Sequence, residues 1–346
     1  MNILYITLAL IITLPITTPA FYKKENRAGI LLCLILAGLA WFIGQSLPML
    51  GGPIIGILTG LIITNIWKNQ DTFTKGIKVS SKRVLQTAIV LFGFQMNLST
   101  VFAMGQQSIL LIVAVIAVAF LVAFFAGRIM NIPYNEKMLI GVGTAICGGS
   151  AIAATAPALD ASDKEVVRAI STIFLFNVIA AFLFPVLGRA LGMSDLAFGM
   201  WAGAAINDTS SVVAAAFVYS DAAGDIATVV KLTRTIFIIP LVLLIALLRA
   251  RSGGSKADVS VMNSFPWFVL GFLLASVINT TGILPVEMTA FWGRMGRFLI
   301  VMAMVAIGFG CNIKELAKGG KKSILLGGLC SLSVGIVAMF LIRGEV

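Results

Sequence analysis

Two short segments place glycine and polar side chains inside long apolar runs. The first contains Thr144-Ala-Ile-Cys147-Gly148-Gly149-Ser150, and the second contains Asn207-Asp208-Thr209-Ser210-Ser211. Consecutive glycines in an apolar run interrupt a helix, and each interruption exposes backbone N–H groups. The start of the following half-helix carries partial positive charge, which, together with hydroxyl donors, suits an oxyanion. These residues are therefore the candidate binding site for a small anion.

Asp208 is the one acidic residue that we expect at membrane depth. An ionised carboxylate is costly there and usually marks an ion or substrate path, so Asp208 is expected to bind a coupled proton or cation. The alternative is that Asp208 lies at an exposed hairpin tip. For the first segment, the alternative is close packing of small residues between helices.

Two basic residues, Lys231 and Arg234, follow on a helix that we expect to start near Asp225. They would lie about 9 to 14 Å along this helix at about 1.5 Å per residue. Residues three apart share a helix face, so both side chains can point at one cavity and offset the charge of a bound anion. Snorkelling to the headgroups is the alternative for Lys231.

The composition excludes a water-soluble globule. Of the 346 residues, 59% are hydrophobic and 11% are charged, whereas a soluble domain carries about 25% charged residues. At roughly 20 residues per membrane helix, the length allows about 10 to 12 membrane elements. The prediction is an all-α integral membrane protein that forms a single transmembrane domain over residues 1–346.

The residue inventory argues against an enzyme. The sequence has no histidine, which excludes HExxH metalloproteases and Ser-His hydrolases. Its four cysteines, Cys33, Cys147, Cys311 and Cys330, show no metal-ligand spacing. No metal, cofactor or disulfide framework is therefore expected. An embedded enzyme or sensor is the least expected function, because the chain also lacks a P-loop and a sizeable domain outside the membrane.

Apolar runs lie near residues 28–47, 52–67, 84–103, 109–127, 166–188, 229–248, 266–283, 296–311 and 323–342. Residues 1–20 are expected to form a further helix rather than a cleaved signal peptide, because no basic leading region or cleavage site is present. The two Gly/Ala/Ser-rich segments, 138–158 and 197–218, complete the set of membrane elements.

The net charge of +11 is interpreted as membrane topology rather than nucleic-acid binding. Alternating loops place 17 of the 25 basic residues on one side: those within 23–27, 68–83, 128–137, 249–256 and 314–322. An excess of Lys and Arg marks the cytoplasmic side. The N-terminus is therefore expected outside the cell.

Two internal repeats indicate inverted symmetry. A shift of 215 residues aligns Gly93-Phe94 with Gly308-Phe309 and Asn97 with Asn312. A shift of 60 aligns the Gly143 to Ser150 segment with the Gly203 to Ser210 segment. If each odd segment is a re-entrant hairpin, its two copies are inverted and agree with the first repeat. We favour hairpins or strongly broken helices that meet at mid-membrane from opposite sides.

The segments around Thr144 and Asp208, followed by Lys231-x-x-Arg234, resemble the YeiH-type family of proposed sulfate exporters. The resemblance covers residues 28–346 and leaves residues 1–27 as an extra helix and basic loop. It implies a multi-pass transporter of the bacterial inner membrane, distantly similar to the bile acid and cation/proton antiporter fold. Some members of the family are associated with His-Glu where this chain has Asn207-Asp208.

The leading hypothesis is export of sulfate or a sulfonate-related anion across the inner membrane. Thr144, Cys147, Asn207 and the glycines and hydroxyls at 148–150 and 209–211 would line the site, with Lys231 and Arg234 opposite the anion. The alternative is a sodium or proton antiporter in which Asp208 binds the cation directly. The expected partners are the lipid bilayer, the anion and a coupling proton or sodium ion, with no nucleic acid; a homodimer is a possible assembly.

Overall fold

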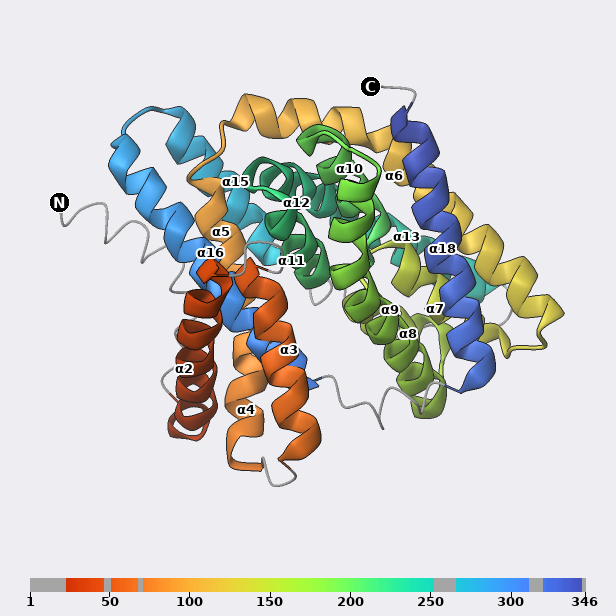
Figure 1. Cartoon of the computed structure of the whole chain (residues 1–346). Helices are drawn as coiled ribbons and strands as arrows, with labels where there is room; N and C mark the ends of the chain where they lie inside the picture. The colour runs from red at the N-terminus through yellow and green to blue at the C-terminus, as the bar shows by residue number, and fades with distance from the viewer. Residues whose placement is uncertain (1–22, 47–50, 68–70, 252–265, 311–319, 344–346) are drawn as a thin grey trace. The chain divides into compact units, whose positions relative to one another are not determined.

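The computed structural model describes residues 23–46, 51–67, 71–251, 266–310 and 320–343, and every regular element among them is helical (Figure 1). Six helices are long and apolar enough to cross a membrane: Lys24–Ser46, Leu98–Ile129, Asp163–Ala190, Asp221–Ile245, Val286–Gly310 and Lys321–Ile342. These spans confirm the prediction of an all-α integral membrane protein. The proposed helix over 1–20, Cys311, Asn312 and most of the 314–322 loop lie outside the described residues.

The chain divides into two compact units, which are described separately. Unit 1 comprises Met1–Ala103 and Trp267–Asn312, and unit 2 comprises Met104–Pro266 and Ile313–Val346. The candidate site residues all belong to unit 2.

Unit 1 contains helices α2 (Lys24–Ser46), α3 (Gly51–Ile66), α4 (Asp71–Val79), α5 (Leu85–Gly93), α15 (Trp267–Thr280) and α16 (Val286–Gly310), with a π-helical turn over Ser80–Val84 between α4 and α5. Its helices pack at glycines. Gly29 of α2 meets Gly76 of α4, and Gly60 of α3 meets Gly308 of α16, so closely that a Cβ would overlap the opposite backbone. Small residues at such crossings are typical of membrane helices, which gain stability from close packing rather than from exclusion of water.

One predicted boundary is wrong. The sequence suggested two helices over 84–103 and 109–127, whereas α5 ends at Gly93 and helix α6 runs without interruption over Leu98–Ile129. The Asn97 carbonyl accepts the Val101 N–H at the start of α6, and Asn is a favoured residue at that position. A single glycine such as Gly105 costs about 1 kcal/mol inside a helix, which is too little to end a long apolar one.

Unit 2 contains both segments that were predicted to be interrupted. The first forms α7 (Tyr134–Ala145) and α8 (Gly149–Leu159), and the second forms α10 (Asp195–Ala205) and α11 (Thr209–Tyr219). Each pair precedes a longer apolar helix, α9 (Asp163–Ala190) or α12 (Asp221–Ile236), and α12 continues into α13 (Ile238–Arg251). The C-terminal helix α18 spans Lys321–Arg343. This succession of helix pair and long helix matches the repeat of 60 residues found in the sequence.

The α10–α11 pair turns back on itself. Ser220, directly after α11, donates a hydrogen bond of 2.7 Å to Asp195 at the start of α10. The ring of Tyr219 stacks on Phe198 with centroids 3.9 Å apart. Both ends of the pair therefore lie together, and we call the pair hairpin 2 and these ends its mouth. Each arm has 11 residues, about 16 Å of helix, which is roughly half of a 30 Å hydrocarbon core.

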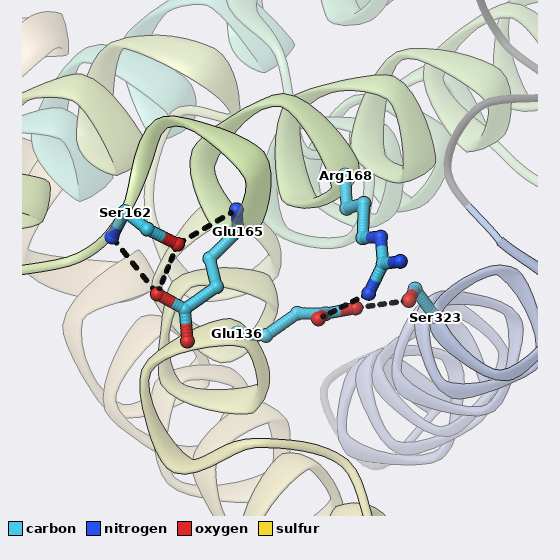
Figure 2. A network of polar contacts seen from close by, with 5 residues as sticks. All are labelled: Glu136, Ser162, Glu165, Arg168 and Ser323. Atoms are coloured by element: carbon cyan, nitrogen blue, oxygen red, sulfur yellow. Dashed lines mark hydrogen bonds and ion pairs between the residues drawn. The ribbon is translucent and has the colours of Figure 1, made fainter.

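The α7–α8 pair also turns back. Ile152 of α8 packs on Gly143 of α7, although residues nine apart would be about 13 Å apart in a straight helix. At the other end, Glu136 of α7 pairs with Arg168 of α9, N to O 3.3 Å, shortly after α8 has ended (Figure 2). This pair is hairpin 1, and its mouth lies beside the start of α9.

Helix α9 shows that the two hairpins enter from opposite sides. Its 28 residues span about 42 Å, enough to cross a hydrocarbon core of about 30 Å. The start of α9 lies at the mouth of hairpin 1, where Ser162 and Glu165 form a capping box (Figure 2). Its last turn lies at the mouth of hairpin 2, where Arg189 donates to the Val218 carbonyl at 2.7 Å. The inverted, re-entrant arrangement favoured from the sequence is therefore the observed one.

Candidate binding site at the hairpin tips

The tips of the two hairpins meet beside the middle of α9. We define the tip region as residues 146–148 of hairpin 1 and 206–208 of hairpin 2. The Asp208 N–H donates to the Asn177 side-chain oxygen at 3.2 Å. A Cβ on Gly148 would lie 3.4 Å from the Asp208 Cβ and 3.5 Å from the Asn177 Nδ2. Because Asn177 is halfway along a membrane-spanning helix, the tip region lies at about mid-membrane.

Gly148 permits the sharp turn at the tip of hairpin 1. Its φ of 67° and ψ of −129° suit a residue without a Cβ. Helix α8 then starts at Gly149, its N-cap residue Gly148 has no side chain to cap it, and Ser150 is exposed. The start of α8 thus presents the donors and partial positive charge that the sequence predicted for an anion site.

Asp208 caps the other half-helix. Its carboxylate accepts hydrogen bonds from the Ser210 N–H, at 3.0 Å, and from the Ser210 hydroxyl. The Asp208 side chain is half-buried, while Thr209, Ser210 and Ser211 are buried around it. A carboxylate at a helix start is favourable, which explains how this fold holds an acidic group at depth.

Lys231 of α12 joins the two tips. Its fully buried ammonium group donates to the carbonyl oxygens of Ile146 at 2.6 Å and Ile206 at 3.1 Å, and to that of Asn207. All three carbonyls lie in the tip region, one on hairpin 1 and two on hairpin 2. These contacts exclude the alternative in which Lys231 snorkels to the headgroups.

Arg234 also joins both hairpins, one turn further along α12. Its guanidinium donates to the carbonyls of Ala145 at 2.7 Å and Ala204 at 2.6 Å. It also donates to the carbonyls of Ile206, at 3.1 Å, and Thr144. These oxygens end α7 and α10, where helices leave carbonyls unpaired and carry partial negative charge. The planar fork of arginine is suited to several acceptors held in fixed directions.

The expected start of the helix carrying these cations is wrong. It begins at Asp221 rather than near Asp225, with Ser220 as its side-chain cap. Lys231 and Arg234 therefore lie about 15 and 20 Å along it, which matches the depth of the hairpin arms. Sequence reasoning placed both cations opposite the anion, whereas their direct partners are backbone carbonyls, which no side-chain pattern reveals.

Lys231, Arg234 and Asp208 set the formal charge at the hairpin tips. Lys231 and Arg234 are fully buried and Asp208 is half-buried, and with each group counted at its ordinary charge at pH 7 the three sum to about +1. The helix ends add little, because two C-termini of about −0.5 each oppose two N-termini of about +0.5 each. An anion at this position would neutralise the remaining charge.

Two further polar residues at the tips were not singled out from the sequence. Asn177 holds the Asp208 backbone, and Ser331 of α18 accepts a hydrogen bond of 3.4 Å from the Asn207 amide nitrogen. The available indication was a polar residue in the middle of each predicted span, Asn177 in one and Ser331 with Ser333 in the other. The Asn207 oxygen, by contrast, has no hydrogen-bond partner among the described residues, although Asn207 is only 3% exposed.

The predicted site residues therefore lie together at the hairpin tips, but they differ in solvent exposure. The Thr144 hydroxyl donates to the Ile140 carbonyl within its own helix at 2.9 Å, and Cys147 is a buried free thiol. Among the predicted site residues of hairpin 1, Gly149 and Ser150 are the more accessible. Among the described residues, no group of three His, Cys, Asp or Glu side chains could hold a metal ion.

Comparison with known proteins gives a family and close relatives. Residues 28–327 match the family model described as conserved hypothetical protein 698. A UPF0324 membrane protein of Fusobacterium nucleatum is 42% identical over 331 residues, covering 90% of this chain and 96% of the relative. A UPF0324 membrane protein of Streptococcus pyogenes serotype M6 is 46% identical over 322 residues, covering 90% and 95%. Another from Streptococcus agalactiae serotype V is 44% identical over 324 residues, covering 91% and 96%.

Proposed function

The chain belongs to the conserved hypothetical protein 698 family of UPF0324 membrane proteins, and from this premise we propose that it is a secondary active transporter that exports sulfate or a related small oxyanion. Its relatives are membrane proteins by name, and six helices of this chain can span a bilayer. The proposal extends this transporter-like character to a substrate class and a site.

The observation that carries the proposal is the net positive tip region between two hairpins that enter from opposite sides. A buried uncompensated charge is costly in a membrane, so an anion bound there is favoured. A site at mid-membrane, formed by half-helix ends from two inverted elements, is also the arrangement in which secondary transporters bind substrates.

Each group at the tips has a part in this proposal. The uncapped start of α8, with Gly149 and Ser150, donates to the anion. Lys231 and Arg234 hold the carbonyl ends of α7 and α10, so that these negative ends do not repel the anion. Asp208 takes up the coupling proton, which would raise the formal charge at the tips from about +1 to about +2 and strengthen the binding of the anion.

A binding screen with purified protein tests the proposal. Sulfate, sulfite, thiosulfate, taurine and simple carboxylates are added separately, and the thermal unfolding temperature is measured. A ligand at 100 times its dissociation constant stabilises the native state by about 2.7 kcal/mol, so a true substrate should raise this temperature. Stabilisation by sodium alone, with no response to any anion, would instead favour the antiporter with Asp208 as its cation site.

A further inference from the structure

The side-chain oxygen of Asn207 is a buried acceptor that the protein leaves unused. The residue is 3% exposed, and this oxygen has no partner among the described residues. Two neighbouring groups are already engaged. Lys231 donates to three carbonyls, including that of Asn207 itself, and Ser331 accepts the hydrogen bond from the Asn207 amide nitrogen. An unpaired buried acceptor is unfavourable, so a donor brought by a ligand would be bound strongly.

The position of Asn207 connects this acceptor with the proposed site. Asn207 lies in the tip of hairpin 2, directly before Asp208, the cap of α11. Its backbone carbonyl is fixed by Lys231, and its amide nitrogen is fixed by α18. The oxygen is therefore presented in a set direction, as expected of a group that orients a ligand.

The neighbouring positive charges disfavour a metal cation as the partner of the Asn207 oxygen. The Lys231 ammonium group contacts the backbone oxygen of the same residue, and Arg234 contacts the adjacent Ile206 carbonyl. A sodium ion on the Asn207 amide oxygen would lie close to both positive groups, with strong repulsion at low dielectric constant. A neutral donor group on an anion meets no such repulsion.

We propose that the transported ligand is a singly charged oxyanion that carries its own hydroxyl or N–H donor, which binds the Asn207 oxygen. This inference rests on the proposed function, because it selects one class among small oxyanions. The single charge matches the tip region with Asp208 ionised, and the donor matches the unused acceptor. Asn207 is then the residue that distinguishes such ligands from oxyanions without a donor.

A matched pair of ligands tests this inference on the unmodified protein. The ions 2-hydroxyethanesulfonate and ethanesulfonate carry the same charge and differ in one hydroxyl group. Their dissociation constants are measured by calorimetry on the purified full chain, with sulfate as a third ligand. We expect 2-hydroxyethanesulfonate to bind about tenfold more tightly than ethanesulfonate, because a site with a buried polar group discriminates against a ligand that leaves it unpaired.

Two variants assign the preference to Asn207. Asn207→Leu removes the amide at similar size, and the ratio of the two dissociation constants should fall to about one. Asp163→Asn changes an exposed carboxylate at the start of α9, away from the tips, so the preference should persist. Thermal unfolding of each variant shows whether it is folded. If a variant does not fold, the ratio of the two dissociation constants on the unmodified protein still tests the donor requirement.

The outcomes separate this inference from the proposed function. Equal binding of the two sulfonates, or tighter binding of sulfate than of both, would overturn the donor requirement while leaving anion transport in place. Absence of binding by all three ions and by the wider anion panel would count against the proposed function itself.

Discussion

Asp208 combines two tasks that can be separated by substitution. Its carboxylate caps α11, and in the proposed mechanism it also carries the coupling proton. Asparagine caps helices about as well as aspartate but cannot take up that proton. Asp208→Asn should therefore abolish proton-driven flux in proteoliposomes while the purified protein still binds the anion. Asp163→Asn, which changes an exposed carboxylate in the first turn of α9, serves as the control and should transport normally.

Full transport with ordinary pH dependence in the Asp208→Asn protein would remove this residue from the mechanism. The hydroxyl groups around it would then be a binding surface without a coupling role.

Arg234 is expected to stabilise the fold, because it holds the ends of the two hairpins together. Lysine has one compact ammonium group and cannot reach carbonyls on both hairpins in the way the guanidinium fork does. Arg234→Lys should thus lower the free energy of unfolding by about 3 kcal/mol, since several buried carbonyls lose their donor. Arg168→Lys, at a side chain that is 36% exposed, should cost at most about 1 kcal/mol. Equal unfolding temperatures for the two variants would show that the contacts between Arg234 and the carbonyls do not stabilise the fold.

For single residues, the sequence predicted which ones lie together at the hairpin tips but not which groups each side chain contacts. Gly148, Asp208 and Lys231 were identified by their residue types within apolar runs, and they do meet at the tips. The carbonyl partners of Lys231 could not be predicted, because every residue has a backbone oxygen and the sequence does not show which one a side chain contacts. The same reason explains why the cations were assigned to the anion rather than to the ends of α7 and α10.

Among the elements, the turn of hairpin 1 depends on one glycine. Gly148 has a φ of 67°, which residues with a side chain rarely adopt, and Gly148→Ala should cost about 1 to 3 kcal/mol of stability. Gly149 is the first residue of α8, where a Cβ would meet only the Phe174 ring at 3.4 Å. Gly149→Ala should therefore be close to neutral. Unfolding temperatures of the two neighbouring variants provide the comparison, and similar losses would show that crowding rather than backbone conformation is responsible.

The hairpins could be predicted because their sequence copies are related, and because Gly148-Gly149 in one and Asn207-Asp208 in the other interrupt apolar runs. Helix boundaries were less predictable. The break before α6 falls at residues 94–97, within a run that stays apolar on both sides, so hydropathy alone placed it about ten residues too late. Asn97 was the better indication, because its carbonyl starts the new helix.

For the whole molecule, two segments that were predicted on one side of the membrane, 128–137 and 314–322, have their adjoining residues in contact at the start of α9. Glu136, which is 1% exposed, is paired with Arg168 and accepts a hydrogen bond from Ser323 at the start of α18 (Figure 2). These residues lie near the loops with Arg128, Lys137 and Lys321. The sequence thus predicted which ends share a face of unit 2, and its assignment of that face to the cytoplasm stays a prediction.

The two ends of α9 offer the sharpest test of that orientation. Lys164 in its first turn and Leu191 just after its last residue are both exposed, and about 40 Å of helix separates them. Position 76, in α4 within the basic segment 68–83, is less suitable, because Gly76 is buried against the α2 backbone. In intact cells, a cysteine in place of Leu191 should react with a membrane-impermeant thiol reagent, whereas a cysteine in place of Lys164 should react only after the membrane is opened. The reverse pattern would place the basic loops outside. Reaction of both from one side would mean that α9 does not cross, and the hairpins would then enter from the same side, without the alternating access that the transport proposal requires.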